Sequence, residues 1–188
     1  MSKAKKTIPD QLINTFNESL NVLITRPEFK GQALSMSLKN IGIRAQHCNL
    51  FTYQESSLEK IKNQCERLLT KSNESTLIFV SVAAVEYANR IIPSNLWCYR
   101  QVFSIGDATQ AKLNDLGLAS VSPERQNSEG LLQIKELEAV SDDDIVIVRG
   151  DAGRELIFDT LNQRGAHVSY AQSYQRVWLK PSSDEIIN

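Results

Sequence analysis

Small, polar and cationic residues follow the apolar runs of this sequence. They are Thr25 and Arg26, Ser81, Gly106 to Thr109, and Arg149 to Arg154. Each precedes a stretch with helical periodicity, so each is expected at a helix N-terminus, where unpaired N–H groups carry partial positive charge. Together with hydroxyls and arginines, such groups suit carboxylates or phosphates. The pattern predicts a site for an acidic ligand.

The hydroxyl residues have a second interpretation. Ser81, Thr109 and Ser128 are of the types that commonly cap helices. For any one of them alone, a cap is as good an explanation as a ligand contact. Only their joint placement argues for a site, and the sequence leaves both the cap and the ligand contact open.

The sequence lacks the residues that several other common chemistries require. The sequence has no GxxxxGK[ST] motif, and the glycine cluster 150–154 lacks the spacing of a dinucleotide fingerprint. It has no GxSxG motif, and the acidic run 142–144 is typical of a solvated turn. Cys48, Cys65 and Cys98 are widely spaced, and the only two histidines fall on expected strands, so no metal site is predicted.

The elements that must position these residues alternate between strand and helix. Strands are expected at 20–25, 43–53, 76–80, 102–105, 145–148 and 168–171, and helices after Pro27 and at 56–69, 82–92, 110–116, 128–137 and 154–163. The first helix is predicted to bury Leu34, Leu38 and Ile41 and to end at Gly42. Such alternation predicts parallel sheets covered by helices, with ligands beyond the carboxyl ends of the strands.

Composition narrows the class of protein further. The chain has 188 residues, of which 41% are hydrophobic, and 21 basic against 22 acidic side chains leave a net charge of −1. Neither nucleic-acid binding nor membrane binding is predicted from this balance. No apolar run approaches the ~20 residues of a membrane span, and residues 1–19 lack a signal-peptide core. We therefore expect a cytoplasmic protein with reduced thiols.

Several short motifs resemble those of one family. The run Val22–Pro27 is similar to the opening strand of uroporphyrinogen-III synthases, which ends in Thr-Arg-Pro. The segments that match further along, in order, are 78–85, 104–109, 128–132, 149–156, 165–168 and 174–176. The resemblance covers residues 20–177. One departure is Val80, where the family usually has threonine.

The resemblance implies a fold. It is an α/β fold of two flavodoxin-like or Rossmann-like parallel-sheet domains joined by a two-stranded linker, with the first domain incomplete at its C-terminal part. Residues 1–18 would be a polar extension, 19–51 with 175–188 the partial first domain and linker, and 52–174 the second domain.

The resemblance also implies an activity, namely cyclisation of hydroxymethylbilane to uroporphyrinogen III with inversion of ring D. No cofactor is implied, and the substrate would be handed over by hydroxymethylbilane synthase. Tyr174 matches the family's linker tyrosine and is expected to act as a proton donor, because a phenol is protonated at neutral pH. The expected contacts to substrate carboxylates are Thr25, Arg26, Ser81, Gly106, Thr109, Ser128, Arg149 and Arg154.

Two alternatives remain beside this interpretation. Tyr174 could equally pack the linker through its ring, since tyrosine combines apolar area with a polar tip. The whole chain could be a non-catalytic flavodoxin-like module that binds an acidic small molecule or a protein partner.

Overall fold

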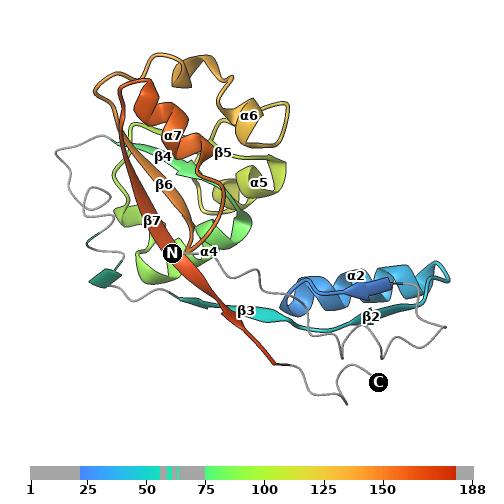
Figure 1. The fold of residues 1–188 in the computed structure, drawn as a ribbon. Coiled ribbons are helices and arrows are strands. Elements are labelled where there is room, and N and C mark those ends of the chain that lie inside the picture. Colours follow the sequence, from blue (N-terminus) through green and yellow to red (C-terminus); the bar gives the residue numbers. More distant parts are fainter. Residues whose placement is uncertain (1–21, 56–58, 61–62, 64–74, 181–188) are drawn as a thin grey trace, which may run out of the picture. The chain divides into compact units, whose positions relative to one another are not determined.

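The computed structural model describes residues 22–55, 59–60, 63 and 75–180 (Figure 1). The chain divides into two compact units. Unit 1 is Met1–Tyr53 with Arg176–Asn188, and unit 2 is Gln54–Gln175. The domain boundaries expected from the sequence stay a prediction.

The described part of unit 1 begins with a strand, a helix and a second strand. Strand β1 (Val22–Ile24) pairs in parallel with β2 (Ala45–His47), and α2 (Glu28–Asn40) connects them. Pro27 precedes the helix, as its restricted φ and missing N–H allow. Gly42, with φ 82°, ends the helix, because an L side chain disfavours this left-handed conformation. Both ends of α2 confirm the prediction.

The predicted buried face of α2 is wrong. Leu34 is 41% exposed and Ile41 71% exposed, whereas Gly31 and Ser35 are buried. A Cβ atom at Gly31 would lie 2.1 Å from the Arg26 carbonyl oxygen, so only glycine permits this approach. The Ser35 hydroxyl donates to the Ala45 carbonyl at 3.2 Å. The helix therefore packs through small residues, which hydrophobic periodicity does not reveal.

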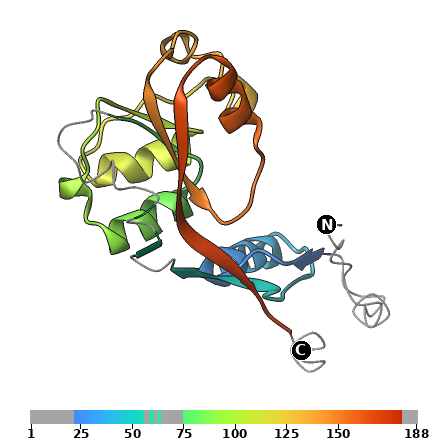
Figure 2. The same ribbon diagram turned by 60° about the vertical axis from the view of Figure 1, so that its left-hand side comes forward.

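The larger sheet has the strand order β3-β7-β6-β4-β5. Its strands are β3 (Phe51–Glu55), β4 (Thr76–Phe79), β5 (Gln101–Ser104), β6 (Asp144–Gly150) and β7 (His167–Trp178). Strand β4 pairs in parallel with β5 and β6, and β6 pairs in parallel with β7. This arrangement confirms the α/β class with parallel sheets. Strand β7 is much longer than the predicted strand 168–171 (Figure 2).

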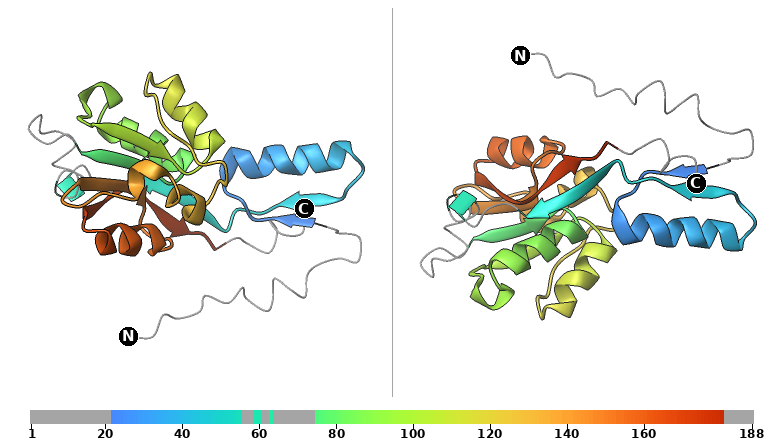
Figure 3. Two further views of the ribbon diagram at one scale, coloured as in Figure 1. Left: turned by 90° about the horizontal axis from the view of Figure 1, so that it is seen from above. Right: turned by 90° about the horizontal axis from the view of Figure 1, so that it is seen from below.

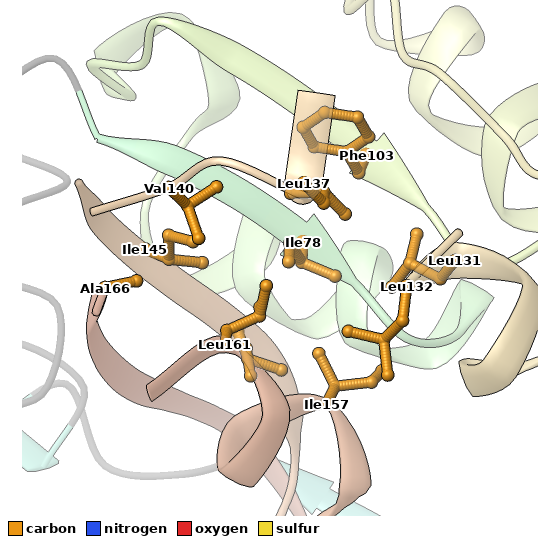
Figure 4. Close-up of a cluster of buried hydrophobic side chains, with 11 residues drawn as sticks. Ile78, Phe103, Leu131, Leu132, Leu137, Val140, Ile145, Ile157, Leu161 and Ala166 are labelled. Carbon is orange, nitrogen blue, oxygen red and sulfur yellow. The ribbon is translucent and has the colours of Figure 1, made fainter. Parts of the chain in front are cut away.

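Helices cover both faces of this sheet. Helices α4 (Val82–Ile91) and α5 (Asp107–Asp115) lie on one face, and α7 (Leu156–Gln163) lies on the other (Figure 3). On the α7 side, Ile78 and Ile145 of the sheet meet Leu131, Ile157 and Leu161 in a buried cluster (Figure 4). All four residues of β4 are buried, as expected of a central strand covered on both faces.

Three predicted helices differ from the structure. Helix α5 begins at Asp107 instead of residue 110, so Gly106 is its N-cap and residues 107–109 belong to its first turn. The predicted helix 128–137 is only α6 (Ser128–Leu131), followed by a 3₁₀ turn at Lys135–Leu137. Arg164 donates to the carbonyl oxygens of Leu132 and Leu137 at 3.0 and 2.7 Å. The Arg164 guanidinium thus supplies these carbonyl oxygens with the hydrogen bonds that backbone N–H groups would supply in a longer helix.

The third difference is α7, which begins at Leu156 instead of residue 154 because Arg149 contacts the two residues before it. The predicted helix 56–69 lies almost wholly outside the described residues.

Candidate active site

The candidate site lies at the carboxyl ends of the unit 2 strands. Strand β4 comes first in unit 2, and its neighbours β5 and β6 lie on opposite sides of it. The chain therefore leaves β4 toward one side and later crosses to the other. In open parallel sheets, ligands bind beyond the strand ends at such a reversal of strand order. Ser81 stands two residues after β4, at this position.

Ser81 caps α4. Its backbone is extended, with φ −169° and ψ 159°, and its hydroxyl oxygen accepts a hydrogen bond from the Ala84 N–H at 3.1 Å. The cap interpretation of Ser81 is therefore confirmed. The same hydroxyl lies 3.5 Å from the Tyr174 phenol oxygen, 93 positions away in the sequence. Ser81 thus adjoins the predicted proton donor.

Tyr174 on β7 is held by contacts with two other elements, α4 and β6. It is 6% exposed and comes from β7. Its ring centroid lies 5.6 Å from that of Tyr87 on α4, and the ring also lies against Gly150 at the end of β6. Packing and proximity to Ser81 therefore occur together, and the packing interpretation does not displace the chemical one.

A β-bulge sets the direction of the Tyr174 side chain. Arg149 pairs with Gln172, but Gly150 pairs with Tyr174, so Ser173 is an extra residue on β7. Its hydroxyl lies 3.2 Å from the Ala84 carbonyl oxygen and 3.4 Å from that of Arg149. Bulges commonly re-aim a side chain next to an active site. Ser173 and Tyr87 are not among the positions predicted from the sequence, because no local pattern reveals strand register. Gly150 lies within the predicted range 149–154, but no role of its own was predicted for it.

The start of α5 provides a second cluster. Gly106 is the N-cap without a side chain, and Thr109 is buried in the first turn. The Gln126 side chain covers this helix end, since it accepts from the Asp107 N–H at 3.3 Å and donates to the Asp107 carboxylate at 2.5 Å. Gln126 also carries no signal in the sequence. The predicted cap at Ser128 is wrong, because the Asn127 side chain caps α6 by accepting from the Gly130 N–H at 2.8 Å.

Arg149 is occupied by contacts within the chain. Its side chain is 7% exposed, and its guanidinium donates to Glu155 at 3.1 Å and to the Arg154 carbonyl oxygen at 3.4 Å. Its Cζ atom lies 4.6 Å from the Tyr170 ring centroid. The Tyr170 hydroxyl donates to the Glu155 carboxylate. These contacts join β6, β7 and the start of α7 in one network.

Burial raises the pKa of the Tyr170 phenol well above its ordinary value, and its hydrogen bond to Glu155 adds to the shift, while Arg149 opposes it. Tyr170 is thus a hydrogen-bond donor within this network.

Arg154 differs from Arg149 in its exposure. Its side chain is 64% exposed and donates to the Glu129 carboxylate at 2.5 Å. This hydrogen bond lowers the pKa of Glu129 and raises that of Arg154. The guanidinium is accessible to a carboxylate in solution.

In unit 1, Thr25 is half-buried and Arg26 exposed. The Arg26 carbonyl oxygen lies 2.7 Å from Nε2 of His47, which gives that histidine a structural contact.

In ranges 22–55, 59–60, 63 and 75–180, no group of three or more His, Cys, Asp or Glu side chains gathers as a metal site would require. No helix in this part of the chain is long and apolar enough to cross a membrane.

A parallel sheet with helices on both faces defines an open-sheet α/β protein, and the hydroxyl–phenol pair at its carboxyl edge is the candidate ligand site. The comparisons with known proteins narrow this class. The model of one family, described as uroporphyrinogen-III synthase HemD, matches residues 11–188. The chain therefore belongs to the uroporphyrinogen-III synthase family, whose members catalyse a cyclising, lyase-type reaction in tetrapyrrole biosynthesis.

Individual relatives agree with this assignment. Uroporphyrinogen-III synthase of Proteus mirabilis is 32% identical over 176 residues, which cover 88% of this chain and 85% of the relative. The Escherichia coli K12 enzyme is 31% identical over 162 residues, which cover 84% of this chain and 65% of the relative. The chain thus spans just under two thirds of that relative. The comparisons give no support to the alternative of a non-catalytic module.

Solved structures agree on the fold. A mutant form of uroporphyrinogen III synthase from Thermus thermophilus matches with a TM-score of 0.67 at 13% identity. The match covers 85% of this chain and 64% of the Thermus chain. The Helicobacter pylori protein has a TM-score of 0.55 at 12% identity, with coverages of 88% and 66%. At these identities the likeness shows the fold alone.

Proposed function

We propose that this chain is a uroporphyrinogen-III synthase that cyclises hydroxymethylbilane with inversion of ring D. Family membership supports the reaction. The observation that carries the proposal is the placement of Tyr174, a buried phenol 3.5 Å from Ser81 at the N-terminus of α4. In this proposal Tyr174 is the proton donor, and the start of α4 beside it binds a substrate carboxylate.

In the proposed reaction, the Tyr174 phenol donates its proton to the hydroxyl of the bilane as the carbon–oxygen bond breaks. Water leaves, and the positive charge spreads over the adjoining pyrrole. Ring D, as the nucleophile, attacks this cation to form a spiro intermediate, which then rearranges to close the macrocycle in the inverted order. The ring carbon that forms the last bond releases one proton, which restores the phenol, so the net reaction is loss of water.

The carboxylates of the substrate are assigned to the polar groups at the helix starts. Ser81 and the first N–H groups of α4 form one contact, and Gly106 with Thr109 on α5 forms a second. Arg154 is the accessible cation assigned to the substrate, while Arg149 stabilises the turn that follows β6. Thr25, Arg26 and Ser128 are proposed as further contacts, and their support is the family resemblance.

Two assignments concern the setting of the reaction. Delivery of the unstable linear substrate by hydroxymethylbilane synthase would limit its spontaneous closure, and we include this hand-over in the proposal. A cytoplasmic location fits the free thiols of Cys48 and Cys98.

The test of the activity is to incubate the purified chain with freshly generated hydroxymethylbilane, oxidise the products, and separate the type III and type I isomers. Spontaneous closure gives type I, so an excess of type III over a protein-free control supports the synthase. An unchanged isomer ratio from a folded protein rejects it.

The role of Tyr174 has its own test. Replacement Tyr174→Phe keeps the ring and its packing but removes the proton. The proposal expects kcat to fall by ~10²-fold or more, the typical range for loss of a general acid. Unaltered kcat would reject the donor role while leaving the activity itself in place.

A further inference from the structure

The register of β6 and β7 makes one residue necessary for the placement of Tyr174. Gly150 is the last residue of β6 and pairs with Tyr174 across the bulge at Ser173. A Cβ atom at Gly150 would lie 2.6 Å from Cε2 of the Tyr174 ring, 2.7 Å from Cζ and 3.1 Å from the phenol oxygen. Those atoms are at the reactive end of the ring. Glycine leaves the space that they occupy.

Conformational freedom does not explain a glycine here. The glycines of the described chain with positive φ are Gly42, Gly117 and Gly165, and Gly150 is not among them. An alanine could adopt the same backbone conformation. The requirement at Gly150 is therefore the space taken by the Tyr174 ring.

We infer that Gly150 is a positioning residue for Tyr174, and that its missing side chain sets the distance between the phenol and Ser81. This inference rests on the proposed function. It assigns to Gly150 no contact with substrate, since it acts through the ring that lies against it.

The size of the effect follows from the distances. The shortest distance from a new Cβ to the Tyr174 ring, 2.6 Å, would be about 0.8 Å less than the 3.4 Å at which ordinary van der Waals contact begins. The ring cannot turn away freely, because Tyr87 lies against it and the Ser173 hydroxyl ties the strand to α4 and β6. The phenol must therefore shift by a comparable distance. A misplacement of about 1 Å can cost ~10²-fold in rate.

The experiment is a double-mutant cycle that measures kcat and KM for hydroxymethylbilane in the wild type, Gly150→Ala, Tyr174→Phe and the double variant. The expected result is a fall of ~10- to 10²-fold in kcat for Gly150→Ala, with a smaller change in KM. In the Tyr174→Phe background, Gly150→Ala should have little further effect, because the proton has already been lost. Equal falls in both backgrounds would overturn the inference.

A matched control separates positioning from loss of stability. Ala166→Val overpacks the core at the other end of β7, where Ala166 is 5% exposed. It should lower the urea midpoint as Gly150→Ala does, yet leave kcat within about twofold of the wild type, because the phenol is not displaced. A fall in kcat equal to that of Gly150→Ala would contradict the inference.

Urea unfolding tests the geometry without relying on enzyme activity. A negative result there is therefore distinct from failure of the proposed function. Gly150→Ala should lower the urea midpoint of the wild type, and this loss should shrink in a Tyr174→Ala background, where the opposing ring is absent. If the loss stays the same, the ring does not occupy the space above Gly150, and the inference is wrong whether or not the chain is active.

Discussion

Replacing Arg149 by methionine should destabilise unit 2 by about 2 kcal/mol. The bond to Glu155 contributes about 1 kcal/mol, because that carboxylate is 55% exposed and partly screened. The stacking of the guanidinium on Tyr170 adds about 1 kcal/mol, and the 3.4 Å bond to the Arg154 carbonyl oxygen adds roughly 0.5 kcal/mol. Methionine recovers part of the packing. Glu155 remains hydrated, so the larger penalty of a buried unpaired charge does not arise.

Urea unfolding measures this loss. The chain has two tryptophans, of which Trp97 lies in unit 2, is 6% exposed and packs on Phe79. In a Trp178→Phe background, tryptophan fluorescence reports on unit 2 alone. With an m-value of about 2 kcal/mol/M, Arg149→Met should lower the midpoint by roughly 1 M.

The matched control is Arg100→Met, which removes an exposed arginine that pairs with Asp143 at 2.6 Å. It should cost less than about 1 kcal/mol, as exposed ion pairs do. The reasoning about Arg149 is refuted if its replacement lowers the midpoint no more than this control does. An unchanged midpoint with a KM raised about tenfold would instead assign the Arg149 guanidinium to the substrate.

Three further residues are tested, namely Arg154, Ser81 and Tyr170. Arg154→Gln should change stability by less than ~0.5 kcal/mol but raise KM about tenfold, whereas Arg100→Gln at the opposite strand ends should leave KM unchanged. Ser81→Ala should cost about 1 kcal/mol of stability through loss of the cap. Ser81→Asp should keep the cap yet raise KM, because its charge repels carboxylates; equal KM values would exclude a substrate contact.

The last of the three concerns pH. The pKa of Tyr170 is raised above its ordinary value of 10.0, chiefly by burial and then by Glu155. The unfolded chain therefore releases this proton first, and unit 2 should lose stability as pH rises above 10. Urea midpoints measured across this range should fall less steeply for Tyr170→Phe, and equal slopes would contradict the assignment.

The sequence predicted the features that depend on neighbouring residues. The apolar run of β4 signals a strand buried on both faces, and Ser81 after it signals the start of α4. Gly42 marks the end of α2 for the same local reason. These signals were sufficient for most of the order of elements, but the predicted strand 43–53 is two strands, β2 and β3, which belong to different sheets.

Features that depend on distant segments were not predicted. The bulge at Ser173 depends on register between β6 and β7, and the face of α2 depends on a close approach at Gly31. The end of α6 depends on Arg164, which reaches carbonyl groups 27 and 32 positions away. None of these pairings has a periodic signal, so the positioning of the site could not be derived from the pattern of residues.

The measurement that tests the central claim most directly is a single-turnover assay with the 188-residue chain in molar excess over hydroxymethylbilane. Under these conditions slow product release cannot hide the chemistry. The account predicts that the share of type III isomer rises with protein concentration until it replaces type I. A share that stays at the protein-free value, from a chain shown to be folded, would contradict it.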